Sequence, residues 1–466
     1  MKKIFNQLLV ILGLSMALSA CHKAEDARIS PALIVTANGI KSDTLSGTVK
    51  GTMLAGKTYY FNKDITVNDG DTLLMQAGVK LLAIGDGLTP ETSPEIFMHG
   101  TFISLGTPAN PNYITVPNAA DLHTQATQQK YTNVFLGWWG GITCTPAAAT
   151  SSNPSPKGGD LILKWTHVEF SGGPAGASDN QAFYTTGSPR YNVYFANITK
   201  NMIIEDCWFF GSKDDNIRTD GGKISVMRNT FELCGGVGGE FLNMKSGTVG
   251  DVAYNMCIGS ATNSLKVSDA GSTGTQAYVN LYNNTMVNGG YRQTKAGRGG
   301  AVDFEKLGKG NCYNNLFINC RFSLRVTSDA DDPNVKYNNN LFYGQNSSIV
   351  GQFYSTDSYT GIKQGANDII STTPKSNAPL FYGYDIDQFT YANPTAPMTA
   401  SLQPYAVIAI GNGNFKIQGT SPAVGKGKVD FSPLGTVTST GVYGTTITLP
   451  GKDLGAYQTD GTGNQH

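Results

Sequence analysis

A short pattern of polar and apolar residues recurs six times in the middle of the chain. A polar residue, usually Asn, is followed two positions later by a large apolar one. The six copies are Asp206-Cys207-Trp208, Asn229-Thr230-Phe231, Asn255-Met256-Cys257, Asn284-Thr285-Met286, Asn315-Leu316-Phe317 and Asn340-Leu341-Phe342. Successive Asp or Asn positions are 23, 26, 29, 31 and 25 residues apart, and a repeat period in this range is typical of stacked solenoids. The pattern therefore predicts a solenoid in which each copy belongs to one coil.

A second short strand is predicted after each of the first five copies, at residues 217–219, 242–244, 265–267, 302–304 and 324–326. In these strands apolar flanking positions, apart from Thr219, alternate with a polar central one, so the two kinds of side chain face opposite sides. We expect two buried columns in the stacked coils. One comprises Trp208, Phe231, Cys257, Met286, Phe317 and Phe342, and the other Ile217, Leu242, Leu265, Val302 and Leu324.

The polar residues of the repeated pattern form a third column, from Asp206 to Asn340. Asn tolerates left-handed backbone geometry at a turn, and its amide can bond the turn of the neighbouring coil. We interpret this column as a structural ladder and not as a binding site.

Two regions outside the repeats resemble known β-helix proteins. Residues 137–142 (GWWGGI) precede residues 165–173 (WTHVEFSGG), and this order resembles the opening coils of surface-exported right-handed parallel β-helix proteins of Bacteroidetes type. Residues 414–417, 421–427 and 452–457 resemble the ending of bacterial pectate-lyase-like proteins. The resemblance implies an all-β fold, a single-stranded right-handed parallel β-helix with capping segments. We expect the C-terminal segment to close the open end of the solenoid, because an uncovered sheet edge invites aggregation.

The N-terminal residues predict export and lipid attachment. Lys2 and Lys3 precede an apolar run up to Leu18, and residues 18–21 (LSAC) read as a lipobox. We divide the chain into a signal peptide with a lipid-modified Cys21 (1–21), a tether (22–45), a parallel β-helix (46–390) and a C-terminal capping segment (391–466). An ordinary signal peptide cut after Ala20 is the alternative. No later stretch reaches the roughly 20 apolar residues of a membrane span, so we expect a protein held by lipid at the outer membrane, on its periplasmic or cell-surface side.

The composition excludes one class of binding partner. Lys and Arg number 34, as do Asp and Glu, which gives a net charge of zero and no basic stripe for nucleic acid. We expect a monomer. Six cysteines remain besides Cys21, and an even number in an exported chain permits disulfides. Because Cys257 falls on a buried column, we favour free, packed cysteines.

The outward faces of the second strands gather polar and charged residues. One row reads Arg218, Asn243, Lys266, Asp303 and Arg325, and the row two residues further on reads Asp220, Lys245, Ser268, Glu305 and Thr327. Adjacent strands lie about 4.8 Å apart, so the ten side chains predict a compact polar surface that could hold an extended polysaccharide. Arg218, Asn243 and Arg325 are the expected substrate-binding residues. The leading hypothesis is a surface lipoprotein that binds polysaccharide or assists its processing, and a structural or adhesive solenoid is an alternative.

A second resemblance suggests catalysis. Lys245-Ser246 and Lys266 resemble the catalytic pair of chondroitinase-B-like and alginate-lyase-like polysaccharide lyases, in which Lys acts as the base and an Arg one coil later as the acid. The resemblance implies a calcium ion that neutralises the uronate carboxylate, with Glu240 as a ligand. This chain departs from the family at Gly238, where a second Glu is expected, and it lacks a His after Lys266.

Two pairs of acidic residues suggest further catalytic or metal-binding sites. Asp303 and Glu305 could serve as the two carboxylates of a glycosidase, or belong to a surface charge ladder in which Lys266 and Arg325 keep Asp303 ionised. Asp214 and Asp215 could bind calcium or resemble a polygalacturonase strand, or they could simply end a turn.

Overall fold

The computed structural model describes residues 39–128, 130–177, 179, 184–236, 238–271, 273–293, 297–354, 362, 364–388, 414–437 and 447–465. The predicted signal peptide, Cys21 and most of the tether lie outside these ranges. None of the helices in the described residues is both long and apolar enough to cross a bilayer.

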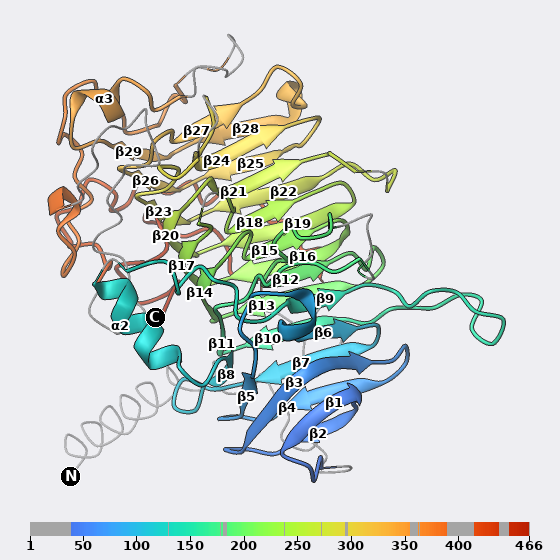
Figure 1. Ribbon diagram of the computed structural model, residues 1–466. Helices are drawn as coiled ribbons and strands as arrows, with labels where there is room; N and C mark the ends of the chain where they lie inside the picture. The colour runs from blue at the N-terminus through green and yellow to red at the C-terminus, as the bar shows by residue number, and fades with distance from the viewer. Residues whose placement is uncertain are drawn as a thin grey trace, which may run out of the picture.

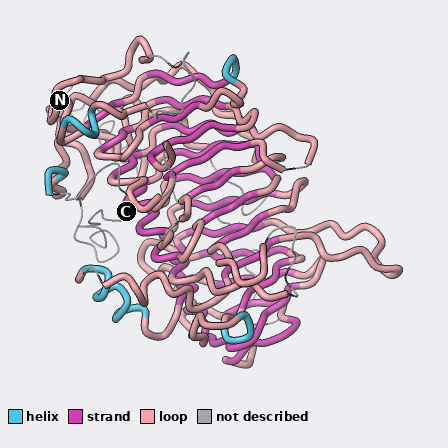
Figure 2. Tube along the Cα trace, turned by 45° about the horizontal axis from the view of Figure 1, so that its top comes forward, coloured by secondary structure: helices cyan, strands magenta, loops and turns pink. Residues whose placement is uncertain are grey.

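Strands of successive coils stack in parallel, and the predicted parallel β-helix is confirmed (Figure 1). Each full coil contributes one strand to a ten-stranded sheet and one strand to each of two ladders of a 19-stranded sheet. Figure 2 shows the strands of neighbouring coils lying one above another. All pairings between named strands are parallel, as expected when each coil returns to the same position one layer further on.

The ten-stranded sheet consists of β2 (Gly51–Met53), β4 (Thr72–Met75), β7 (Thr101–Leu105), β10 (Leu161–Lys164), β13 (Asn201–Glu205), β16 (Gly222–Met227), β19 (Thr248–Ala253), β22 (Tyr278–Tyr282), β25 (Gly310–Tyr313) and β28 (Val335–Asn338). The first ladder consists of β5 (Lys80–Ala83), β8 (Asn112–Thr115), β11 (Thr166–Glu169), β14 (Trp208–Ser212), β17 (Thr230–Cys234), β20 (Met256–Ser260), β23 (Thr285–Val287), β26 (Leu316–Ile318) and β29 (Leu341–Tyr343).

The second ladder consists of β6 (Glu95–Met98), β9 (Gly141–Cys144), β12 (Val193–Phe195), β15 (Ile217–Thr219), β18 (Leu242–Met244), β21 (Asn263–Ser268), β24 (Gly300–Glu305) and β27 (Leu324–Val326). The long strand β3 (Thr58–Val67) pairs with β5 through its first half and with β6 through its second, so it joins the two ladders. At the N-terminal end β1 (Thr44–Thr48) pairs with β3.

Helices are few and lie in the connections. The helix α2 (Ala119–Thr127) sits between β8 and β9, and α3 (Ser347–Val350) follows β29. Three 3-10 turns occur at η3 (Pro90–Thr92), η4 (Asp332–Asn334) and η5 (Ile386–Gln388). The loop at residues 145–160 projects away from the coils between β9 and β10 (Figure 1).

The structure corrects the register of one coil. Phe209, and not Trp208, aligns with Phe231, and their rings stack with centroids 5.0 Å apart. The buried column is therefore Phe209, Phe231, Cys257, Met286, Phe317 and Phe342. Because side chains alternate along a strand, the one-residue slip places Trp208 on the outer face, where it is half-buried. The second predicted column, from Ile217 to Leu324, is confirmed.

The asparagine ladder is confirmed from Asn229 to Asn340, with a correction at its first rung. Each side-chain amide donates to Oδ1 of the Asn in the next coil, at 2.9 Å from Asn229 to Asn255 and at 3.0 to 3.2 Å along the rest of the ladder. The same Oδ1 accepts the backbone N–H of the preceding rung. Cys207 occupies the first position, since its N–H donates to Asn229 Oδ1 at 2.9 Å. Asp206 instead aligns with Arg228 and forms an ion pair with it at 2.9 Å.

The left-handed residue of each turn also differs from the expectation. The residue just before each ladder position has positive φ, between 51° and 62°; these residues are Asp206, Arg228, Tyr254, Asn283, Asn314 and Asn339. The ladder Asn itself is free to keep its amide along the stacking direction, because its neighbour makes the turn.

The C-terminal segment packs along the side of the coils and does not close their end. Leu454, Ala456 and Tyr457 join a buried cluster with Met256, Leu316 and other outward residues of the first ladder. The end of the core is instead closed by Ile349 of α3 and by Phe353. The predicted role of an end cap is therefore wrong for the described residues 414–437 and 447–465, which cover a lateral face (Figure 1).

The cysteines are free, as expected. Within the described residues Cys144, Cys207, Cys234, Cys257, Cys312 and Cys320 are all buried and form no disulfide. Burial raises the pKa of each of these thiols, so they are packed apolar groups and poor nucleophiles.

Candidate functional site

The predicted polar row lies on the outer face of the second ladder. Cα pairing places Arg218, Asn243, Lys266, Asp303 and Arg325 side by side on successive strands. The row is less exposed than a surface site would be, since Asn243, Lys266, Asp303 and Arg325 are only 2 to 8% exposed. Arg218 and Lys245 remain half-exposed. The accessible part of the polar face is thus its end near β15 and β18.

A glycine-rich loop between β17 and β18 positions Glu240. Gly239 has a φ of +131°, and a Cβ at this position would lie 2.9 Å from the carbonyl oxygen of Asp214, so a side chain is excluded here. Asp215, in the turn one coil earlier, accepts the N–H of Glu240 at 2.7 Å through Oδ1 and the Asn243 amide at 2.9 Å through Oδ2. The hypothesis that Asp214 and Asp215 end a turn agrees with this geometry, and Asp215 also anchors the neighbouring coil.

The C-terminal half of the row is locked by ion pairs. Lys266 Nζ lies 3.0 Å from Glu305, and Arg325 Nη1 lies 2.7 Å from Asp303 and 3.2 Å from Glu305. Although burial opposes the change, Lys266 and Arg325 lower the pKa of Glu305 to about 2. Burial raises the pKa of Asp303 to about 6 because Arg325 and Lys266 offset only part of its cost. Both carboxylates are held in ion pairs with Lys266 and Arg325, and this geometry favours the charge ladder over a glycosidase pair.

Tyrosines flank the accessible half. Arg218 Nη1 donates to the Tyr191 hydroxyl at 2.7 Å, and its guanidinium lies over that ring at 5.1 Å. Tyr194 donates to Asp220 at 2.7 Å. The loop carrying Tyr191 is tied down by Arg190, whose Nε lies 2.8 Å from Glu95 of β6. Arg218 is thereby held in one orientation beside Lys245.

Lys245 differs from the other cations of this face. Among the described residues it forms no ion pair within 4.0 Å. Burial, Arg218 and Lys266 together lower its pKa, since a neutral amine is favoured when desolvated next to other positive charges. Burial and Glu240 raise the pKa of Asp214 to about 6. Burial and Asp215 raise the pKa of Glu240 to about 8, so Glu240 is protonated at neutral pH and donates to Asp215.

The carboxylates predicted as calcium ligands lie close together. Besides burial, the like charges of Asp214, Asp215 and Glu240 raise one another's pKa, and Asp215 already accepts two hydrogen bonds. The described part of the chain has no group of three or more His, Cys, Asp or Glu side chains placed to hold a metal ion. Calcium binding by these carboxylates stays a prediction from the sequence.

Two residues of the site were missed from the sequence. Tyr194 continues the polar row by one coil, in register with Arg218, and extending the row toward the N-terminus would have found it. Tyr191 lies in the loop between β11 and β12, outside any repeat, so no spacing signal marks it. Asn243 Oδ1, in the middle of the row, is buried without a hydrogen-bond partner.

In comparisons with known proteins, no family model and no curated sequence matches this chain. The resemblances to exported β-helix proteins and to lyases accordingly stay predictions from motifs, and functional roles have to be argued from the geometry.

Proposed function

We propose that the polar face around Lys245 binds a polysaccharide that carries carboxylate groups. The observation that supports this proposal is the half-buried Lys245, which has no ion-pair partner among the described residues and lies beside Arg218 and Lys266. Three neighbouring cations repel one another unless an anion lies between them, and a uronate carboxylate supplies that charge through charge-assisted hydrogen bonds. Lys266 pairs with Glu305 at 3.0 Å and Arg218 with Asp220 at 3.9 Å, so Lys245 is the cation that meets the ligand, with the half-exposed Arg218 beside it.

The shape of the face suits an extended chain. Strands of the second ladder repeat at about 4.8 Å, and the polar row continues without interruption from Tyr194 to Arg325. The accessible end of the row, at Arg218 and Lys245, is where such a chain would bind.

Affinity electrophoresis tests the binding proposal. The full-length protein, purified in detergent, is run through gels containing polygalacturonate, alginate, hyaluronan or neutral dextran. We expect retardation by at least one acidic polymer, a loss of about tenfold in affinity for Lys245→Gln, and no change for the exposed control Lys223→Gln on the ten-stranded sheet. Equal retardation of both variants, or equal retardation by dextran, would contradict the proposal.

A second candidate function is β-elimination, favoured by the lowered pKa of Lys245. The neutral amine would take the proton from the carbon beside the uronate carboxylate, whose charge Arg218 neutralises. The freed electron pair would form a carbon–carbon double bond and expel the glycosidic oxygen, which would take the proton of Glu240. Burial lowers the pKa of the base and raises that of the acid to about 8, as general acid–base catalysis near neutral pH requires.

The near-ultraviolet absorbance of the unsaturated product tests this second function. Lyase activity should rise as Lys245 loses its proton and fall above about pH 8 as Glu240 loses its own. Lys245→Gln should abolish it, Lys223→Gln should not, and chelation of calcium should leave it unchanged. Binding without any absorbance change on these polymers would leave the protein a binding module.

Anchoring at the membrane is part of the same proposal. Attachment of lipid at Cys21 would hold the β-helix at the outer membrane, through a tether long enough to let the polar face reach a polymer. Metabolic labelling with a fatty acid should mark the wild-type chain but not Cys21→Ser; labelling of both would refute the lipobox interpretation.

A further inference from the structure

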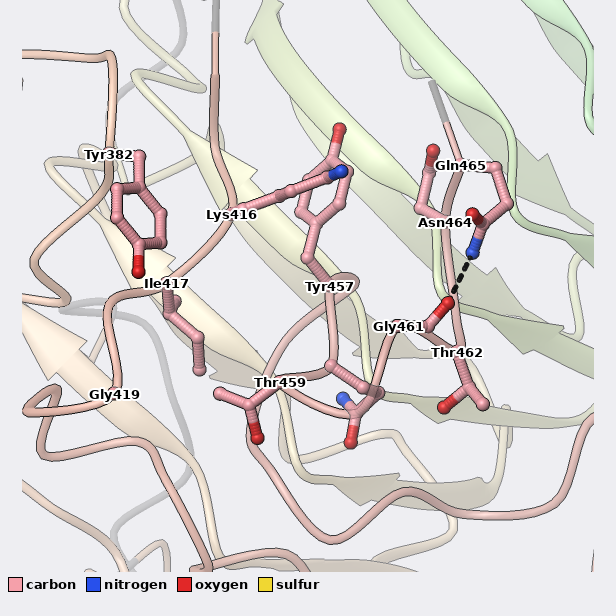
Figure 3. Close-up of a pocket in the computed structure, with 11 residues that line it drawn as sticks. Tyr382, Lys416, Ile417, Gly419, Tyr457, Thr459, Gly461, Thr462, Asn464 and Gln465 are labelled. Carbon is pink, nitrogen blue, oxygen red and sulfur yellow. Dashed lines mark hydrogen bonds between the residues drawn. The ribbon is translucent and has the colours of Figure 1, made fainter. Parts of the chain in front are cut away.

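A depression lies over the first ladder, between the residues around Tyr382 and the C-terminal segment. It has a volume of about 390 Å³ and is lined by eleven residues, among them Tyr382, Lys416, Tyr457 and Gln465 (Figure 3). Such a volume falls near the lower end of the range for small-molecule sites, about 300–1,000 Å³. Its walls come from residues 382, 416–419 and 457–465, which lie over the first ladder and not over the polar face described above.

Antiparallel pairing places an aromatic ring and a cation side by side at one edge. Phe381 bridges to Ile417, and the N–H of Tyr382 donates to the Lys416 carbonyl at 3.0 Å. Phe381, Phe415 and Ile417 are buried beneath, so the alternating neighbours Tyr382 and Lys416 point outward from the same face. Directly opposed residues have Cβ atoms about 4.5–5.5 Å apart. Tyr382 is 65% exposed, with its ring free for stacking.

The opposite wall is held rigidly. The Asn464 amide donates to the carbonyls of Asn229 and Tyr254, both at 3.1 Å, which fixes the wall to the coils. The Gln458 amide donates to Asp453 and Gly455, at 3.1 and 3.0 Å. Figure 3 shows Tyr382 on one side, Asn464 and Gln465 on the other, and Tyr457 between them, with the Lys416 side chain extending toward Tyr457 in this view. A ligand would meet preorganised walls and lose little affinity to their ordering.

The charge of the depression selects the ligand. Lys416 is the single charged residue in its lining, and it forms no ion pair with a carboxylate among the described residues. An exposed tyrosine next to an unpaired lysine, with amides and hydroxyls opposite, matches a sugar ring that bears an acidic group. We propose that this depression is a second carbohydrate site, which takes one acidic sugar unit by stacking on Tyr382 and pairing with Lys416. This inference does not rest on the polar face around Lys245.

Saturation-transfer NMR on the full-length protein tests the site, with methyl glucuronide as the probe and methyl glucoside as its neutral match. We expect transfer to the glucuronide, weakened about tenfold by Lys416→Gln, as for loss of a charge-assisted hydrogen bond, and strongly reduced by Tyr382→Ala. The matched controls Lys223→Gln and Tyr60→Ala change exposed residues elsewhere and should leave transfer unchanged.

The Lys245→Gln variant separates this site from the polar face. Transfer that persists in Lys245→Gln and is weakened about tenfold in Lys416→Gln would support the second site. Transfer lost only in Lys245→Gln would overturn it and leave the polar-face proposal standing. Equal transfer to the glucoside, or no transfer to either sugar, would also overturn the assignment of an acidic sugar.

Discussion

Individual buried asparagines stabilise the stacking of neighbouring coils. Asn284 donates to Asn315 and to the Val252 carbonyl, and it accepts from both the backbone and the side chain of Asn255. Its side chain is fully buried, so no water can replace these partners. The amide thus links three coils at one point.

Removing a central rung should therefore be costly. We expect Asn284→Ala to lower the free energy of unfolding by about 2–4 kcal/mol, because buried backbone and side-chain groups on both sides lose their partners. Urea denaturation measures the loss. The exposed Asn367→Ala serves as control and should change stability by less than about 0.5 kcal/mol; similar values for the two variants would refute the role of the ladder.

The protonated Glu240 makes stability depend on pH. Its folded pKa, raised by burial to about 8, exceeds the ordinary value near 4.5, so its contribution is fully present below about pH 4.5 and is lost as pH rises through about 8. Glu240→Gln mimics the protonated form. We expect equal stability of variant and wild type near pH 4.5, and a variant advantage on the order of 5 kcal/mol above pH 8. Thermal melts at both pH values measure it, and a gap of the same size at both would refute the shift.

At the scale of elements, register decides which aromatic enters the core. The repeated pattern pairs Trp208 with Phe231 by position after a polar residue, whereas the strands pair Trp208 with Thr230 and Phe209 with Phe231. The pattern misaligned this coil because Cys207 occupies the position that Asn holds in the later coils, and the polar residue Asp206 stands one position earlier. The Asp206–Arg228 ion pair and the Cys207 N–H bond to Asn229 decide the register in the fold.

Paired truncations test the register. Phe209→Ala should cost about 3–5 kcal/mol of unfolding free energy, since it empties a fully buried site stacked on Phe231. Trp208→Ala should cost less than half as much, because the indole is only partly buried on the outer face. Denaturant titration of the two variants measures both, and the reverse order would restore the register expected from the sequence.

For the whole molecule, the C-terminal segment is a lateral cover. It hides outward apolar residues of the first ladder, among them Met256, Val287 and Leu316, which would otherwise form an exposed apolar patch across several coils. Leu454 belongs to this cover and is completely buried against the coils. A substitution at this residue should therefore weaken the contact between the cover and the coils.

We expect Leu454→Asp to release the cover while the coils stay folded, because a buried unpaired carboxylate is costly. The variant should bind an apolar dye more strongly and be cleaved faster within residues 414–465. Leu449→Asp, at a residue 69% exposed in the same segment, should behave as wild type. An end cap would instead fray the last coils, which hydrogen exchange at β28 and β29 would reveal.

Periodicity in the sequence was enough to predict the parallel β-helix, the asparagine ladder, the second buried column and the polar row from Arg218 to Arg325, because each depends on local alternation repeated once per coil. Tertiary structure alone decided the offset at Phe209, the lateral course of the C-terminal segment and the approach of Tyr191 to Arg218. Those features depend on loops whose lengths vary between coils and on contacts between residues far apart in the chain. Residue spacing does not reveal burial either. Only the structure shows that Asp303 and Glu305 are buried in ion pairs whereas Lys245 is accessible.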